Sequence, residues 1–125
     1  MSKKVDIFKT ILALAETTVE GVEHIYERTM EGHFEETAEI FTDVADAFHE
    51  MRMALITYLP TYRGSDLEKV TGEVTEGMKL MLAAFEGEHD VRPMVVLQFS
   101  LVPGFKKWHI ALQEVLGATC AAAMN

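Results

Sequence analysis

The sequence is poor in several residue types, and each shortage excludes a class of protein. A single cysteine, Cys120, excludes an intrachain disulfide framework and favours a reducing, cytoplasmic setting. Eleven lysines and arginines stand against 20 acidic residues, and a net charge of −9 disfavours nucleic acid and membrane surfaces as partners. The longest apolar stretch, Met94 to Phe105, contains polar residues and a proline, so it is shorter than the about 18 apolar residues of a membrane span.

The sequence also lacks the motifs that carry common enzyme chemistry. It has no phosphate-binding glycine loop, no Cys-x-x-Cys pair and no recognisable Ser/His/Asp arrangement, and its histidines show no His-x-x-x-His spacing. Arg28 and His33 have the Arg-x4-His spacing that resembles a signature of helical-bundle RNases, but the helix-ending Gly32 separates them. We therefore predict no catalytic residue and no bound cofactor, and we favour a non-enzymatic protein.

The sequence does contain an apolar residue at every third or fourth position along most of its length. This spacing places the apolar side chains on one face of a helix. It predicts an all-α protein, a single domain over 1–125, with helices over about residues 5–30, 34–59, 66–87 and 91–116. Because short connections favour antiparallel neighbours, we expect an up-down-up-down four-helix bundle.

Local signals predict where the first three helices begin and end. Gly32 is suited to end the first helix, because glycine enters the left-handed conformation without a Cβ penalty. Pro60 ends the second, since proline disfavours a helical conformation at the residue before it. Ser65 and Glu68 form a capping-box pattern that opens the third helix.

The fourth predicted helix has a proline in its middle. Asp90 is its expected N-cap, and Gly117 its expected end, followed by a loosely ordered tail. The apolar stripe keeps its phase across Pro103, which predicts a kink or a one-turn break near that residue. Trp108 lies in phase with the stripe, so we expect it to anchor the core.

Acidic residues form rows on the first two predicted helices, and their direction decides how they are interpreted. At about 100° per residue the rows point away from the apolar stripes, which predicts solvated faces. Two pairs, Asp46 with His49 and Glu86 with His89, loosely match the ligand pattern of di-iron bundles. A metal-binding helical bundle or enzyme is therefore the alternative hypothesis, and an acidic docking surface for a basic partner is a third.

The fourth helix carries more apolar residues than one core-facing stripe requires. Val95, Val96, Phe99 and Val102 lie about 90° to 180° from that stripe on a regular helical wheel. We interpret them as an interface, either for a homodimer or for a protein partner that offers an amphipathic helix. The competing interpretation is that Pro103 tilts the helix inward, or that the tail folds back over these residues.

Three short segments carry a family resemblance: 20–26 (EGVEHIY), 32–36 (GHFEE) and 101–108 (LVPGFKKW). Together they resemble an uncharacterised family of small all-helical proteins and domains from Bacillus-type bacteria. The resemblance implies a compact bacterial helical domain and brings no assigned activity. The function that the sequence favours is thus a protein-interaction module: an adaptor, a regulator or a chaperone-like bundle.

Overall fold

The computed structural model describes residues 3–124, and all regular secondary structure within this range is helical. In chain order the elements are α1 (Lys3–Met30), the 3-10 turn η1 (Phe34–Thr37), α2 (Ala38–Tyr58), α3 (Asp66–Phe85), α4 (Pro93–Val96), the π-helical turn η2 (Leu97–Leu101) and α5 (Val102–Met124). The last three follow one another without a break and make up the fourth predicted helix. The prediction of an all-α protein with four helices is therefore confirmed.

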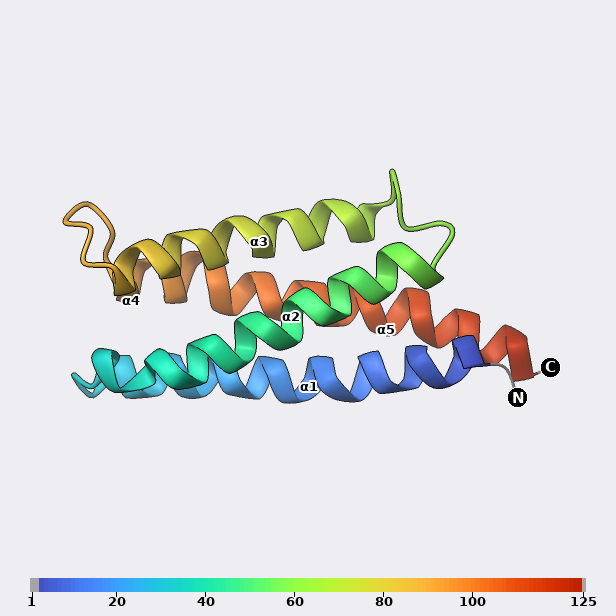
Figure 1. The fold of residues 1–125 in the computed structure, drawn as a ribbon, viewed down its shortest axis with the longest axis horizontal. Coiled ribbons are helices and arrows are strands. Elements are labelled where there is room, and N and C mark those ends of the chain that lie inside the picture. Colours follow the sequence, from blue (N-terminus) through green and yellow to red (C-terminus); the bar gives the residue numbers. More distant parts are fainter. Residues whose placement is uncertain (1–2, 125) are drawn as a thin grey trace.

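The helices pack in an uneven way. In Figure 1 the long α1 lies along α5, and α2 and α3 flank this pair. Contacts are extensive between α1 and α5, α1 and α2, and α3 and α5, whereas α2 and α3 meet over only a short stretch. The side of the molecule between α2 and α3 is thus its most loosely packed part.

Aromatic side chains form the centre of the core. Trp108 is fully buried and packs edge-on against Phe48 and Phe105, with ring centroids 5.1 Å and 5.8 Å away. Its indole Nε1–H donates a hydrogen bond to the buried Thr71 hydroxyl at 3.1 Å. The predicted role of Trp108 as a core anchor is confirmed.

The end of α1 follows the glycine signal. Gly32 has a φ of 87°, and its N–H donates to the Thr29 carbonyl at 3.0 Å. The N–H of His33 donates to the Arg28 carbonyl at 2.9 Å, which completes a Schellman motif. These bonds satisfy carbonyls that the helix end leaves without a partner.

The start of α3 follows the capping signal with one change. The N–H of Glu68 donates to the Ser65 hydroxyl oxygen at 3.2 Å, as a capping box requires. The Glu68 carboxylate, however, accepts from the N–H of Gly64 at 3.0 Å, one residue earlier than in the standard box. Before this loop, α2 stops at Tyr58 and Leu59 is extended, in line with Pro60.

Both predicted ends of the fourth helix were wrong. It begins at Pro93 with Arg92 as N-cap, rather than at 91 with Asp90, since the ring of Pro93 fixes a helical φ at the first position. It also passes Gly117 and continues to Met124. The alanine-rich tail has high helix propensity, and the burial of Leu116 and Cys120 adds tertiary packing, so the chain stays helical.

The turn before Pro103 has a different helical geometry. At the end of η2, the Val102 N–H donates to the Leu97 carbonyl, five residues back, instead of four. Proline has no N–H, and its ring would clash with the carbonyl four residues earlier in a regular α-helix. The wider turn relieves that conflict, and the helix continues into α5.

Candidate functional site

The four predicted interface residues divide into two groups. Phe99 is 70% exposed and Val95 is 48% exposed, so both reach solvent. Val96 is only 7% exposed and belongs to the core, and Val102 is partly buried and packs against it. The π-helical turn explains the difference, because a wheel of constant 100° per residue does not hold across η2 and misplaces Val96.

The structure adds Leu80 of α3 to this surface. Leu80 is 44% exposed and follows Gly77 by three residues, which puts both on one side of α3. A Cβ built on Gly77 would lie 3.1 Å from the Leu101 side chain and 3.9 Å from that of Ser100, so this side of α3 borders η2. Sequence reasoning missed Leu80, although its position off the apolar stripe of α3 was a usable signal.

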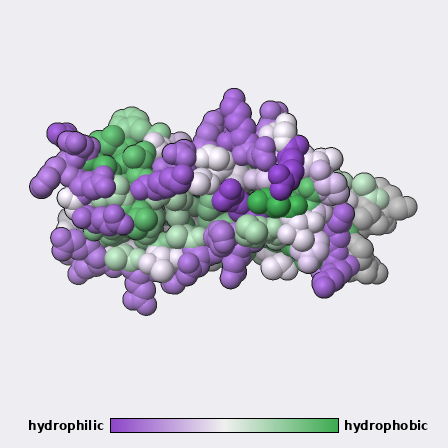
Figure 2. Space-filling view, turned by 45° about the horizontal axis from the view of Figure 1, so that its top comes forward, coloured by the Kyte–Doolittle hydropathy of each residue, from purple (hydrophilic) through white to green (hydrophobic). Residues whose placement is uncertain are grey.

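We call Leu80, Val95 and Phe99 the Phe99 face. Figure 2 shows apolar residues at the surface toward the end of the molecule where α3 finishes and α4 begins, among hydrophilic ones. Beside Phe99 is a shallow hollow of about 290 Å3 that is lined also by Glu73, Ser100, Pro103, Gly104 and Lys107. Lys107 and Glu73 form an exposed ion pair at 3.6 Å. An apolar centre with a charged rim is the usual anatomy of a protein-binding surface.

The candidate metal ligands do not come together. Asp46, His49, Glu86 and His89 are all exposed; the first two lie on α2, Glu86 is the C-cap of α3, and His89 is in the following loop. Within residues 3–124, no three His, Cys, Asp or Glu side chains are grouped so that they could hold a metal ion. No observation in this part of the chain therefore favours the metal-binding alternative.

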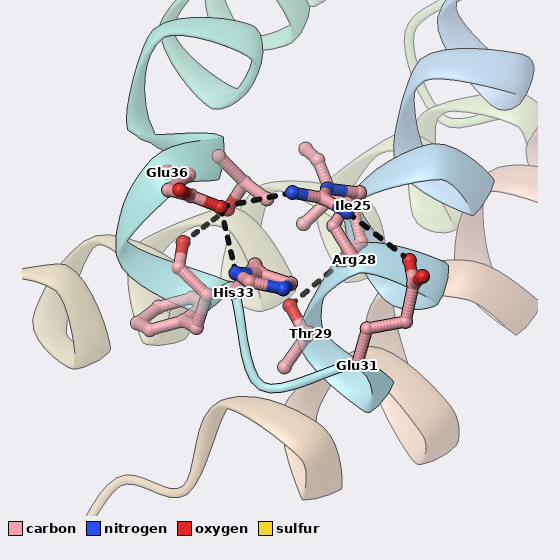
Figure 3. Close-up of polar contacts among 8 residues, drawn as sticks. Ile25, Arg28, Thr29, Glu31, His33 and Glu36 are labelled. Atoms are coloured by element: carbon pink, nitrogen blue, oxygen red, sulfur yellow. Dashed lines mark hydrogen bonds and ion pairs between the residues drawn. The ribbon is translucent and has the colours of Figure 1, made fainter.

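A polar cluster braces the turn between α1 and η1 (Figure 3). One oxygen of Glu36 lies 2.9 Å from Arg28 Nη2 and 2.9 Å from His33 Nδ1, and Arg28 Nη1 lies 3.4 Å from Glu31. The Arg28 and His33 side chains that have an RNase-like spacing are thus both engaged by Glu36. Exposed ion pairs of this kind contribute about 1 kcal/mol or less each, so the cluster holds the turn locally.

The fold and its surface define a class of protein: an all-helical domain with exposed apolar side chains on its surface. A family model described as a domain of unknown function (DUF8042) matches residues 6–111, from α1 into α5 and including all of the Phe99 face. The chain belongs to this uncharacterised family. No curated protein and no solved structure shows a significant match. Within the described residues, every helix is too short or too polar to cross a membrane.

Proposed function

We propose that this domain is a non-enzymatic, cytoplasmic protein-interaction module of bacterial origin that associates with itself through the Phe99 face. It would act as an adaptor, a regulator or a chaperone-like protein. The observation that carries this proposal is the 70% exposure of Phe99, with Val95 four residues before it and Leu80 on the side of α3 that borders η2. Phenylalanine is among the residue types most often buried, and adjoining exposed apolar side chains mark interaction surfaces.

The proposed architecture is an antiparallel up-down-up-down bundle with the fourth helix kinked near Pro103. In this arrangement the Phe99 face is on the outside, where a second copy can approach along a two-fold axis. A two-fold contact pairs the same patch on both copies, so the patch must be self-complementary. The ion pair between Glu73 and Lys107 supports this, because each copy can offer both charges to the opposite charges of the other.

The apolar area predicts a weak homodimer. Full burial of an aliphatic or aromatic side chain contributes about 2 kcal/mol, so the exposed fractions of Phe99, Val95 and Leu80 amount to about 3 kcal/mol per protomer. Two protomers supply about 6 kcal/mol, against an association cost of at least about 4 kcal/mol. The surplus of about 2 kcal/mol alone corresponds to a dissociation constant above about 10 mM, so contacts at the rim must add about 2 kcal/mol or more to bring the dimer into the millimolar range.

Sedimentation velocity over that concentration range tests the proposal. The wild-type chain should change from monomer to dimer, and Phe99→Glu should remain a monomer while its helical circular dichroism is unchanged. Met53→Glu is the matched control, since Met53 is also helical and is 46% exposed, but lies on α2. A wild-type chain that stays monomeric throughout, or a Phe99→Glu variant that dimerises like the Met53→Glu variant, would disprove self-association through this face.

A further inference from the structure

A second concave surface lies between α2 and α3, apart from the Phe99 face. It is a groove of about 330 Å3, and the buried side chains of Phe41, Phe48 and Met78 form its floor. The groove exists because α2 packs on α1 and α3 packs on α5, while α2 and α3 contact each other only briefly. A volume above about 300 Å3 is in the range of small-molecule binding sites.

The two ends of this α2–α3 groove differ in chemistry. At one end Phe41 belongs to a group of aromatic rings: the Phe85 ring lies tilted against that of Phe41, with centroids 5.0 Å apart, and stacked on that of Phe34, with centroids 4.2 Å apart. Eleven residues further along α2, the lining includes Arg52, and His49 lies one turn before it. The groove is therefore apolar at one end and basic toward the other.

The charge of the lining is opposite to that of the whole chain. Arg52 and Lys79 line the groove, and none of the described lining residues carries a carboxylate, although the chain has a net charge of −9. Arg52 is partly buried and forms no ion pair with any residue in 3–124. Lys79 pairs with Glu76 at 3.3 Å, and both side chains are exposed, so that pair is easily exchanged.

We propose that the α2–α3 groove binds an amphipathic carboxylate: an unbranched acyl chain on the apolar floor, with its carboxylate at Arg52. The planar guanidinium group of Arg52 can form two parallel hydrogen bonds with a carboxylate. Lys79 and His49 also line the groove and are further hydrogen-bond donors. The distance along α2 from Phe41 to Arg52 is about 16 Å, which accommodates an extended chain of about twelve carbons. The methyl end of the acyl chain would pack near the Phe41 ring, and the carboxylate at the other end would neutralise the Arg52 guanidinium group.

The size of the groove favours an acyl chain over a partner helix. Three turns of helix, about 16 Å long and at least 10 Å wide, occupy about 1,300 Å3, which is more than the groove can hold. A helix could therefore place only its edge in the groove. It would also need an interface of about 800 Å2 per partner, which reaches well beyond these walls.

Isothermal titration calorimetry with dodecanoate, below its micelle concentration, tests the proposal on the full chain. We expect one dodecanoate per chain, with Arg52→Gln weakening binding about tenfold or more because a charge-assisted hydrogen bond is lost. Ala45→Trp should abolish binding by filling the groove from α2. Arg92→Gln is the matched control, since Arg92 is an exposed arginine outside the groove, and it should bind like the wild type.

Other outcomes would overturn the proposal. These are no dodecanoate binding, equal binding of dodecyltrimethylammonium, or unchanged binding by an Ala45→Trp variant that retains its helical circular dichroism. A peptide with an acidic amphipathic helix that binds where dodecanoate does not would replace the acyl chain as occupant. The proposal is independent of self-association, because Phe99→Glu should leave dodecanoate binding unchanged.

Discussion

The hydrogen bond between Trp108 and Thr71 gives the sharpest test of how the core is held together. The Trp108 indole N–H is buried, and the hydroxyl of Thr71 accepts its hydrogen bond at 3.1 Å while donating to the Leu67 carbonyl at 2.6 Å. Thr71→Val keeps the shape of the side chain but removes the acceptor. Helix propensity is nearly the same for the two residues, so the change reports on the two hydrogen bonds of the hydroxyl, to Trp108 and to the Leu67 carbonyl.

The expected loss follows from the unsatisfied donor. A buried polar group that loses its partner costs about 1–3 kcal/mol, and the added methyl group of valine offsets part of this in the apolar core. We expect Thr71→Val to lower the free energy of unfolding by about 1–2 kcal/mol, or the melting temperature by about 5 °C for a chain of this size. Thr71→Ser retains the hydroxyl and should leave the hydrogen bond intact.

A double-mutant cycle measures the bond directly. Urea unfolding would be followed by far-ultraviolet circular dichroism for the wild type, Thr71→Val, Trp108→Phe and the double variant. In the Trp108→Phe background no indole donor remains, so Thr71→Val removes only the bond to the Leu67 carbonyl and should cost less than in the wild type, with a coupling energy of about 1 kcal/mol or more. A Thr71→Val effect of equal size in both backgrounds would refute the reasoning, since it would show that the hydroxyl acts through something other than Trp108.

Three further substitutions test local features: two concern backbone conformation, and one concerns an ion-pair cluster. Gly72 lies within α3 and has open space where a Cβ would stand, so Gly72→Ala should raise the free energy of unfolding by about 0.5–1 kcal/mol in urea unfolding. Gly64 has equally open space but a φ of 80°, so Gly64→Ala should be destabilising; the same sign for both would contradict the conformational argument. Glu36→Gln removes the charge shared by Arg28 and His33 and should cost about 1 kcal/mol or less, with the loss shrinking in high salt. A loss that is independent of salt would count against an ionic role.

The features that sequence could predict are those set by local rules. Gly32 and Ser65 act through their own backbone and side chain, so their roles as helix terminator and helix cap need no tertiary information. The apolar spacing predicted the buried face of each helix, and hence Trp108. The exposure of Phe99 was predicted in the same way, because Phe99 lies off the apolar stripe of the fourth helix.

The features that sequence could not predict depend on geometry between helices. Val96 lies off the stripe on a regular wheel, yet it is buried because η2 changes the rotation per residue just after it. The α2–α3 groove depends on which helices pack closely, and no single helix carries that information. The sequence therefore could not indicate Arg52 as a candidate binding residue, because Arg52 lines a groove that forms only when the helices pack together.

Both candidate surfaces include residues of α3. Gly77 lets α3 approach so closely that a Cβ would stand 3.1 Å from the Leu101 side chain, and a Cβ on Gly104 of α5 would stand in ordinary contact, 3.6 Å from the Val74 side chain. Gly77 thus lies where α3 meets η2, and Leu80, three residues further on, lies on the same side of α3. The close contact of α2 is with α1, where a Cβ on Gly21 would stand 3.0 Å from the Val44 side chain. α2 and α3 meet only briefly, and the α2–α3 groove lies between them, on the side that has none of these close contacts.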